Sequence, residues 1–159
     1  MDTSFNMFLE TEVPDDELII SRTDLKGNIT YANETFAMIS GYDPDELIGK
    51  SHNIVRHPDM PKSVFKELWA TLGRGENWQG FVKNRRKDGG YYWVHAEVSG
   101  VYKDGKLVEY KSLRTPIENE TKINMQNKYD TMRKEEEKSS RVVMYVSDEN
   151  LEKIKEIIG

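Results

Sequence analysis

The sequence predicts an α+β domain with a five-stranded antiparallel sheet, short helices on one face of that sheet, and a helical extension at the C-terminus. Three observations predict this architecture. Two short apolar runs flank a glycine-containing turn near residue 27, an apolar helical stripe follows at residues 61–72, and three strand-like runs come after it. Two strands, then helices, then a three-stranded meander are typical of one sheet with helices packed against a single face.

The first two strands are predicted in the runs LIISRTD and ITYAN. The turn sequence Lys26-Gly27-Asn28 lies between them. Glycine and asparagine readily adopt the positive φ angles that a tight turn between antiparallel strands requires. The sequence therefore predicts a short hairpin at the start of the compact region.

Two short helices are expected after this hairpin. Asn33 is a typical N-cap residue for a helix over residues 33–40, and Gly41 is a typical stop. Asp43 followed by Pro44 repeats the same logic, because proline favours the first position of a helix. Both helices end before the irregular polar stretch SHNIVRHPDM.

A longer helix is predicted from Pro61, and it ends at Gly73 and Gly75. Its apolar residues recur at the spacing that places them on one helical face. They are Val64, Phe65, Leu68, Trp69 and Leu72.

Three strands are predicted next, at residues 78–87, 91–102 and 106–117. Asp88-Gly89-Gly90 and Lys103-Asp104-Gly105 supply the turns between them. The first two of these strands alternate apolar and polar residues, as half-buried strands do.

These patterns divide the chain into four segments. We expect a flexible N-terminal cap at residues 1–17, because this stretch is acidic and contains Pro14. The compact domain occupies residues 18–117. An amphipathic linker helix is predicted at 118–138, and a C-terminal extension with a short helix at 139–159.

The linker helix has only a thin apolar stripe, made of Met125, Tyr129 and Met132. Such a stripe needs a partner surface. The following VVMYV run fits either an extra strand or a docked segment, and the short helix is expected to begin at Ser147 or Asp148.

Composition excludes several functional classes. The 159 residues include no cysteine, which excludes disulfides, iron–sulfur clusters, thiolate zinc sites and thiol catalysis. A net charge of −5 argues against nucleic-acid binding. No apolar run approaches the roughly 18 residues of a membrane span, so we expect a cytoplasmic protein without direct membrane insertion. Signature motifs of hydrolases, metalloproteases, nucleotide-binding loops and kinases are missing from the sequence, and we expect no enzymatic activity.

Three stretches resemble the PAS domain of bacterial aerotaxis and energy-taxis receptors. They are TDLKGNITYANETFAMISGYDPDELIGKSHNIVRHPDMP, ENWQGFVKNRRKDGGYYWV and SLRTP, and the resemblance covers residues 18–117. RHPDMP and VKNRRKDG are its most specific parts. The resemblance implies a PAS fold, bound FAD, and a flavoprotein that senses redox state and reports it to the chemotaxis machinery.

The C-terminus departs from the one-chain receptors, which continue into a transmembrane segment and a signalling coiled coil. This chain ends at Gly159. It is more similar to the split form of the system, in which a small cytoplasmic PAS protein works with a membrane-bound chemoreceptor. We therefore expect a homodimer that lies at the inner face of the membrane through its partner.

The polar segment around residue 56 has two interpretations. Arg56 and His57 suit the phosphates or polar ring edge of a dinucleotide, and Asp59 suits either orientation of Arg56 or acceptance of a hydrogen bond from the cofactor. The alternative is a solvated loop that only sets the next helix. The resemblance favours the first interpretation and implies cofactor-binding roles for Arg56, His57, Asp59 and the nearby His52.

Trp78 and Asn84 lie in the first strand of the meander. Trp78 is either an ordinary core aromatic or a wall of the flavin pocket, and the resemblance favours the pocket. Alternation places Val82 and Asn84 on one face. An inward-facing amide needs a partner, which is either a flavin ring edge or a neighbouring strand.

Asn33 and Tyr92 complete the candidate cofactor-binding residues. Asn33 serves as a helix cap, and the resemblance also places it near the flavin. Tyr92 and Trp93 point to opposite faces of their strand. One of them belongs to the core, and Tyr92 is the candidate for the pocket lining.

Haem b is the alternative cofactor, because some PAS domains hold haem through a histidine. The candidate ligands are His52, His57 and His95, and their spacing does not suggest a metal cluster. A third possibility is a cofactor-free PAS module that mediates dimerisation through residues 118–138.

Overall fold

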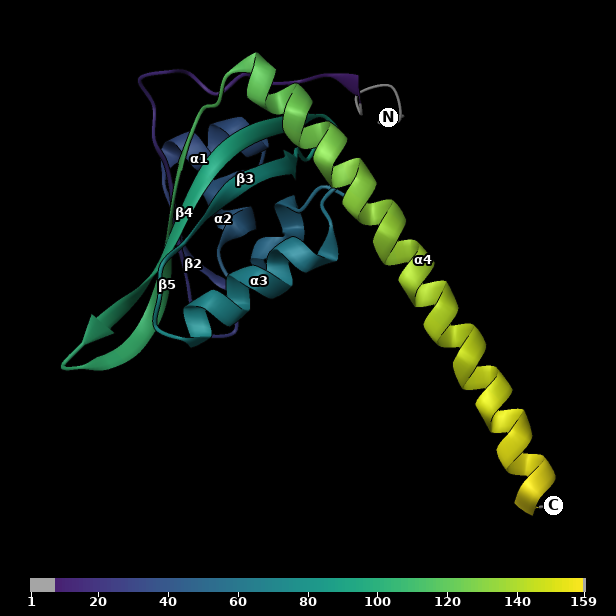
Figure 1. Cartoon of the computed structure of the whole chain (residues 1–159). Helices are drawn as coiled ribbons and strands as arrows, with labels where there is room; N and C mark the ends of the chain where they lie inside the picture. The colour runs from purple at the N-terminus through teal and green to yellow at the C-terminus, as the bar shows by residue number, and fades with distance from the viewer. Residues whose placement is uncertain (1–7, 159) are drawn as a thin grey trace.

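The computed structural model describes the backbone of residues 8–158 and the side chains of residues 8–138. Figure 1 shows a curved sheet with short helices packed on it and one long helix that runs away from the domain. The strands are β1 (Ile19–Thr23), β2 (Ile29–Ala32), β3 (Trp78–Arg85), β4 (Tyr91–Lys103) and β5 (Lys106–Thr115). The helices are α1 (Glu34–Ser40), α2 (Pro44–Leu47), the 3-10 helix η2 (His52–Val55), α3 (Lys62–Gly73) and α4 (Asn119–Ile158).

The five strands form one antiparallel sheet in the order β2-β1-β5-β4-β3. The chain therefore places its last strand, β5, at the centre, between the N-terminal hairpin and the β3–β4 pair. Alternation along β4 sends Tyr92 and Val94 into the core and Trp93 to the opposite face. The predicted α+β sheet fold is confirmed.

Local signals set the ends of the short helices as predicted. The Asn33 side chain accepts a hydrogen bond from the Phe36 N–H (3.0 Å), which caps α1. Gly41 ends the same helix with φ +79°, in the left-handed region where glycine is favoured. The Glu46 side chain accepts from the Asp43 N–H (3.1 Å) and closes the start of α2.

The N-terminal segment is attached to the domain, which differs from the flexible cap expected at residues 1–17. The Thr11 N–H donates to the Tyr91 carbonyl (2.8 Å), and the Tyr91 N–H donates to the Leu9 carbonyl (3.0 Å). Val13 is buried in the core. Pairing with the start of β4 and burial of one apolar side chain hold this segment in place; the first seven residues lie outside the described part.

Helix α4 is continuous, which corrects the expected break after residue 138. The VVMYV run is helical, so the predictions of a strand there and of a separate helix near Ser147 are wrong. The physical reason is that residues 119–158 contain no proline or glycine. Valine lowers helix propensity by at most about 0.7 kcal/mol relative to alanine, which is too little to end a helix.

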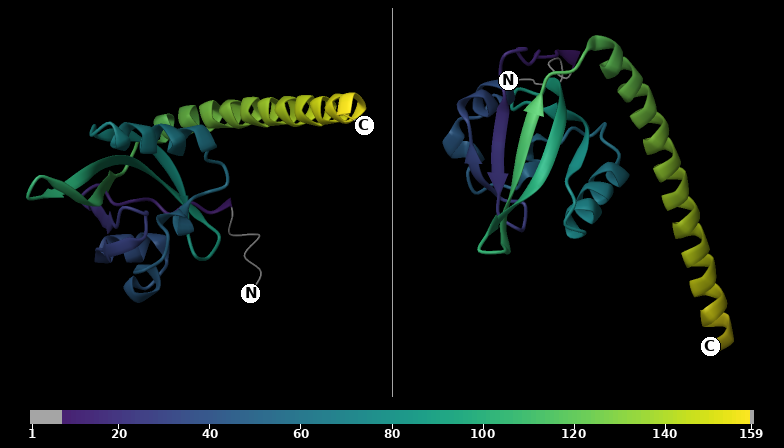
Figure 2. Two further views of the ribbon diagram at one scale, coloured as in Figure 1. Left: turned by 90° about the horizontal axis from the view of Figure 1, so that it is seen from below. Right: turned by 60° about the vertical axis from the view of Figure 1, so that its left-hand side comes forward.

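The first turns of α4 pack on the outer face of the sheet, near the β3 edge. Tyr129 is buried, stacks on Trp93 with ring centroids 6.2 Å apart, and donates its hydroxyl to the Phe81 carbonyl (2.5 Å). Met125 and Met132 also contact the core. The predicted stripe is confirmed, and its partner surface is this domain's own sheet. Beyond these turns α4 stands clear of the domain (Figure 2).

Within the described part of the chain, none of the helices combines the length and the apolar character needed to cross a membrane.

Candidate functional site

A cavity of about 320 Å³ lies between the inner face of the sheet and the helices η2 and α3. This volume is within the range of roughly 300–1,000 Å³ that small-molecule sites occupy. Side chains from β1, β3, β4 and β5 form its floor. Its aromatic lining residues are Phe65, Trp69, Trp78 and Tyr110. The cavity therefore offers flat apolar surfaces on which a ring system can stack.

The charged residues that line the cavity are all basic. Four basic residues, Lys26, Arg56, Lys111 and Arg114, line it, and no acidic residue occurs among the described lining residues. Cationic side chains gathered around a partly desolvated cavity favour an anion, because no local carboxylate neutralises them. The lining therefore favours a negatively charged ligand with an aromatic portion.

Arg114 is the most unusual residue of the site. Its side chain is fully buried, and its guanidinium lies 4.4 Å from the ring centre of Phe36. Nη2 donates to the Ser21 hydroxyl (2.7 Å), and Nη1 lies 2.9 Å from Nε2 of His52. These partners are neutral, so burial lowers the pKa of Arg114 to about 10. Its Nε–H is buried and has no hydrogen-bond partner among the described residues.

His52 is held as a neutral acceptor beside this cation. Its Nε2 lies 3.0 Å from the Ser21 hydroxyl, and its ring stacks on Phe36 at 5.6 Å. Burial and the neighbouring Arg114 lower the pKa of His52 to about 3. The imidazole is therefore uncharged near neutral pH, and its lone pair can accept from the guanidinium.

His52→Gln should flatten the pH dependence of the free energy of unfolding between about pH 4 and pH 6. As the pH falls below 6.5, the unfolded wild-type chain takes up a proton at His52, whereas the folded chain does so only near pH 3. Stability therefore falls with pH by up to about 1.4 kcal/mol per unit from this residue alone. Urea titrations of both proteins at several pH values measure the slopes, and equal slopes would contradict the buried neutral histidine.

Arg56 projects into the cavity from the end of η2. Its guanidinium lies 3.7 Å from the ring centre of Phe65 on α3, and burial lowers its pKa. The backbone of Arg56 also forms an isolated antiparallel bridge with Asn84 of β3. The loop is therefore anchored to the sheet at the point where Arg56 enters the cavity.

Strand β3 supplies a stripe of lining residues, as its alternation predicts. Trp78, Val82 and Asn84 all lie on the cavity side, and all three are buried. Asn84 combines a donor and an acceptor at this wall, which suits a ligand with polar ring edges.

The structure separates the eight predicted cofactor residues into two groups. His52, Arg56, Trp78 and Asn84 line the cavity. The lining residues do not include Asn33, His57, Asp59 or Tyr92. Direct cofactor contact by the second group stays a prediction.

Each residue of the second group has a structural role. Besides capping α1, Asn33 accepts from the Ile20 N–H (3.1 Å) and donates to the Leu18 carbonyl (2.8 Å). Tyr92 is fully buried behind the cavity wall, and burial raises the pKa of its hydroxyl to about 12 against the opposing effect of nearby Arg114.

His57 and Asp59 lie on the other side of the loop, toward α4. The Asp59 N–H donates to Nδ1 of His57 (2.9 Å), and the His57 ring meets Tyr91 edge-on. Burial and the charge of Lys83 lower the pKa of His57 to about 4. Asp59 therefore belongs to the contact between the loop and α4, and His57 packs beside it against Tyr91.

Sequence reasoning missed Arg114, Ser21 and Thr23, which line the cavity from the two central strands. Alternation in β5 places Tyr110, Ser112 and Arg114 on one face, so an inward-pointing arginine was the available signal. Nothing local marks Ser21 or Thr23, since small hydroxyl side chains are common in strands.

Of the three histidines named as candidate haem ligands, only His52 lines the cavity. His95 lies on the outer face of the sheet, with its ring edge-on to Phe81. The Nε2 of His52 already faces Ser21 and Arg114. Across the side chains that the structure describes, no cluster of three or more histidine, cysteine, aspartate or glutamate residues has the geometry of a metal site.

Comparison with known proteins finds the same fold. Residues 29–114 match the family model described as "PAS fold". Over 105 residues the chain is 51% identical to the aerotaxis receptor of Escherichia coli (strain K12), covering 66% of this chain and 21% of the receptor. It is 32% identical to the nitrogen fixation regulatory protein of Klebsiella pneumoniae over 108 residues, 67% of this chain and 22% of that protein. The chain thus spans about a fifth of the length of these relatives.

Solved structures agree. A light-oxygen-voltage domain studied with a flavin analogue superposes with a TM-score of 0.63 at 21% identity, covering 72% of this chain and 89% of that domain. The dark structure of the blue-light photoreceptor Aureochrome1 LOV superposes with a TM-score of 0.61 at 22% identity, covering 69% of this chain and 84% of the other. At this level of identity the likeness establishes the fold.

Proposed function

We propose, from the premise that this chain belongs to the PAS-fold family, that it is a sensor which binds FAD in the cavity beside Arg114. The observation that carries the proposal is the lining of the cavity, which joins aromatic rings to four basic side chains without an acidic one among the described residues. A flavin dinucleotide has the matching chemistry, because it joins two ring systems through a negatively charged pyrophosphate.

Two residues of the cavity lining also carry polar atoms without hydrogen-bond partners in the described part of the chain. The Arg114 Nε–H and the Thr23 hydroxyl are buried, and neither has a hydrogen-bond partner in the described part of the chain. A buried polar atom without a partner costs about 1–3 kcal/mol. A ligand with acceptors that reach both atoms would remove this cost.

Five of the lining residues have defined tasks in this proposal. Arg114 and Ser21 would hold polar ring atoms, Arg56 would meet a phosphate at the loop, and Trp78 would pack against a ring. His52 keeps Arg114 in place as a neutral acceptor, because its low pKa prevents a second positive charge there.

Bound FAD supplies a redox centre whose reduction exchanges a hydrogen-bond acceptor for a donor at the ring edge. The Asn84 amide has one group of each kind and would have to turn to keep a bond with either redox form. A mispaired buried amide costs about 1–3 kcal/mol, which shifts a two-state equilibrium roughly 5- to 150-fold. Asn84 is therefore the residue proposed to convert redox state into a change of the protein.

The relatives support a sensory role. The similarity to an aerotaxis receptor favours redox or energy taxis, and one structural neighbour was studied with a flavin analogue. We extend the proposal to the cellular setting: residues 18–117 act as the sensor domain, and a homodimer signals to a membrane-bound chemoreceptor from the cytoplasmic face. No catalytic turnover is assigned to the cavity.

The absorbance spectrum of the purified protein tests the proposal directly. We expect the two-banded spectrum of oxidised flavin, bleaching on addition of dithionite, and release of FAD on denaturation. A Soret band would transfer the proposal to haem b. A colourless protein that cannot be reconstituted with FAD would reject flavin sensing and leave the cofactor-free interaction module.

A further inference from the structure

The loop at residues 56–60 lies between the cavity and α4. Arg56 lines the cavity, whereas Asp59, three residues later, contacts α4. Strand β3 holds the loop at two adjacent positions. Asn84 pairs with the backbone of Arg56, and the Lys83 N–H donates to the sulfur of Met60 (3.3 Å). One short loop therefore contacts the cavity through Arg56 and α4 through Asp59.

Lys83 is buried on the outer side of this edge, with only 8% of its surface exposed. Its ammonium group donates to the Asp59 carboxylate (2.8 Å) and to the side-chain carbonyl of Gln126 on α4 (2.9 Å). It also lies 4.4 Å from the ring centre of Tyr91. A buried ammonium needs such partners, because desolvation is costly without them.

Helix α4 completes a four-residue group that we call the Asp59 cluster: Asp59, Lys83, Gln126 and Arg133. The Gln126 amide donates to the Asp59 carboxylate (3.1 Å), and Nη1 of Arg133 lies 3.7 Å from the same carboxylate. The loop carboxylate is therefore shared between β3 and α4.

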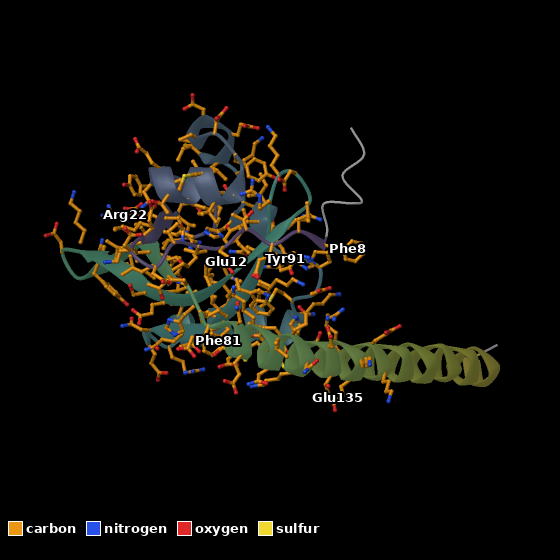
Figure 3. All side chains as sticks on the ribbon, turned by 90° about the horizontal axis from the view of Figure 1, so that it is seen from above. Phe8, Glu12, Arg22, Phe81, Tyr91 and Glu135 are labelled. Atoms are coloured by element: carbon orange, nitrogen blue, oxygen red, sulfur yellow. The ribbon has the colours of Figure 1, made fainter. Side chains whose placement is uncertain are left out.

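A second contact joins α4 to the other wall of the cavity. The Glu136 carboxylate accepts from the N–H groups of Lys62 (3.1 Å) and Ser63 (2.9 Å) at the start of α3. Helix α3 contributes Phe65 and Trp69 to the cavity lining. The docked part of α4 thus contacts both elements that close the cavity over the sheet. Figure 3 labels Phe81, whose carbonyl accepts a hydrogen bond from Tyr129, beside the first turns of α4.

We propose that Lys83 is a positioning residue that acts through Asp59, so that docking of α4 and binding of a flavin in the cavity strengthen each other. The inference rests on the proposed flavin site. It assigns His57 and Asp59 to the placement of Arg56 rather than to the cofactor, since neither lines the cavity and Asp59 contacts α4.

Two physical arguments support this linkage. Removing one partner of a buried charge pair leaves the other charge uncompensated, which is costly. Partly formed states of the Asp59 cluster are therefore less stable than the fully formed state and the fully open one. By thermodynamic reciprocity, if the formed cluster raises flavin affinity, then bound flavin raises the stability of α4 docking by the same factor.

Lys83→Met tests the proposal, because methionine keeps an apolar chain beside Tyr91 and removes the charge. Lys87→Met is the matched control. Lys87 also forms a lysine–carboxylate pair, with Glu46 (2.6 Å), but its side chain is 52% exposed and this pair involves neither the loop nor α4.

FAD affinity is measured by titrating FAD into the full-length apoprotein. Docking of α4 is measured by pulsed electron paramagnetic resonance between nitroxides at Glu97→Cys and Lys134→Cys, which are unique labels in a chain without cysteine.

We expect FAD to narrow the distance distribution of the wild type. Lys83→Met should broaden that distribution and raise the FAD dissociation constant roughly 5- to 150-fold, the usual size of coupling between sites. Lys87→Met should change neither measurement. Gln126→Ala serves as a second variant if Lys83→Met does not fold. It should weaken FAD binding even though Gln126 is not a lining residue.

The possible failures are distinguishable. A wild type that takes up no FAD overturns the proposed function and this coupling together. A wild type that binds FAD without any change in the α4 distance overturns the coupling alone. The coupling is also overturned if the cluster variants release α4 but bind FAD like the wild type.

Discussion

Arg114→Met should abolish FAD binding and raise the melting temperature of the apoprotein. The guanidinium is fully buried, with only neutral hydrogen-bond partners. Removing a buried charged partner of a ligand typically costs about 2–5 kcal/mol of binding free energy. Because the partners of Arg114 are neutral, its replacement by an apolar side chain of similar volume removes the cost of burying the charge and leaves no opposite charge unpaired. The substitution should thus weaken FAD binding and stabilise the apoprotein. This combination indicates a residue that serves ligand binding at the expense of stability.

FAD titration and thermal unfolding of the apoprotein, followed by circular dichroism, measure the two effects separately. Arg22→Met is the matched control, because Arg22 lies on β1 but is exposed, with its guanidinium 5.9 Å from the ring centre of Tyr31. It should leave both quantities nearly unchanged. An Arg114→Met protein that binds FAD normally, or whose apoprotein loses stability, would show that Arg114 serves the fold instead.

Gly80→Ala should destabilise the domain by about 1–3 kcal/mol, the usual cost of overpacking, and weaken FAD binding. A Cβ atom at Gly80 would lie 2.4 Å from two carbons of the Trp78 indole, far inside van der Waals contact. Trp78 is buried and lines the cavity, so its ring would have to move within the site. We expect at least about a tenfold loss of FAD affinity, which corresponds to 1.4 kcal/mol.

Urea unfolding and FAD titration check this expectation. Gly73→Ala is the control, because no atom lies within 4 Å of a Cβ at Gly73, the last residue of α3. Replacing a helical glycine should leave stability equal or raise it by up to about 1 kcal/mol. A Gly80→Ala protein with wild-type stability and affinity would mean that the indole has another equally good position.

Four of the eight predicted cofactor residues line the cavity. Alternation in β3 correctly placed Asn84 on the same face as Val82, whereas the family resemblance, and not the composition of these segments, pointed to Arg56, His52 and Trp78. For His57 and Asp59, in the same loop, direct contact with a cofactor stays a prediction, because neither residue lines the cavity. A 3-10 helix followed by a turn places Arg56 on the cavity side and Asp59 on the α4 side, and no spacing rule covers such a segment.

The long C-terminal helix shows a similar limit. Its thin stripe correctly predicted a partner for Tyr129, but the pattern did not say that the partner was the outer face of the sheet, at Trp93. The buried position of Lys83 follows from this docking. In the sequence, Lys83 lies in a strand predicted to be half-buried, on the face opposite Val82 and Asn84, and nothing local marks it as buried.

Strand alternation, the Asn33 cap, the glycine turns and the helical stripe are readable in the chain because each depends on residues within a few positions of one another. The charge and polarity of the cavity depend on contacts of another kind. Arg114 meets Ser21 across 93 positions and His52 across 62, and these contacts exist only once β5 lies beside β1 at the centre of the sheet. Burial then raises the free-energy cost of an unpaired N–H group on the guanidinium. That cost arises from the folded environment, so no local sequence pattern reveals it.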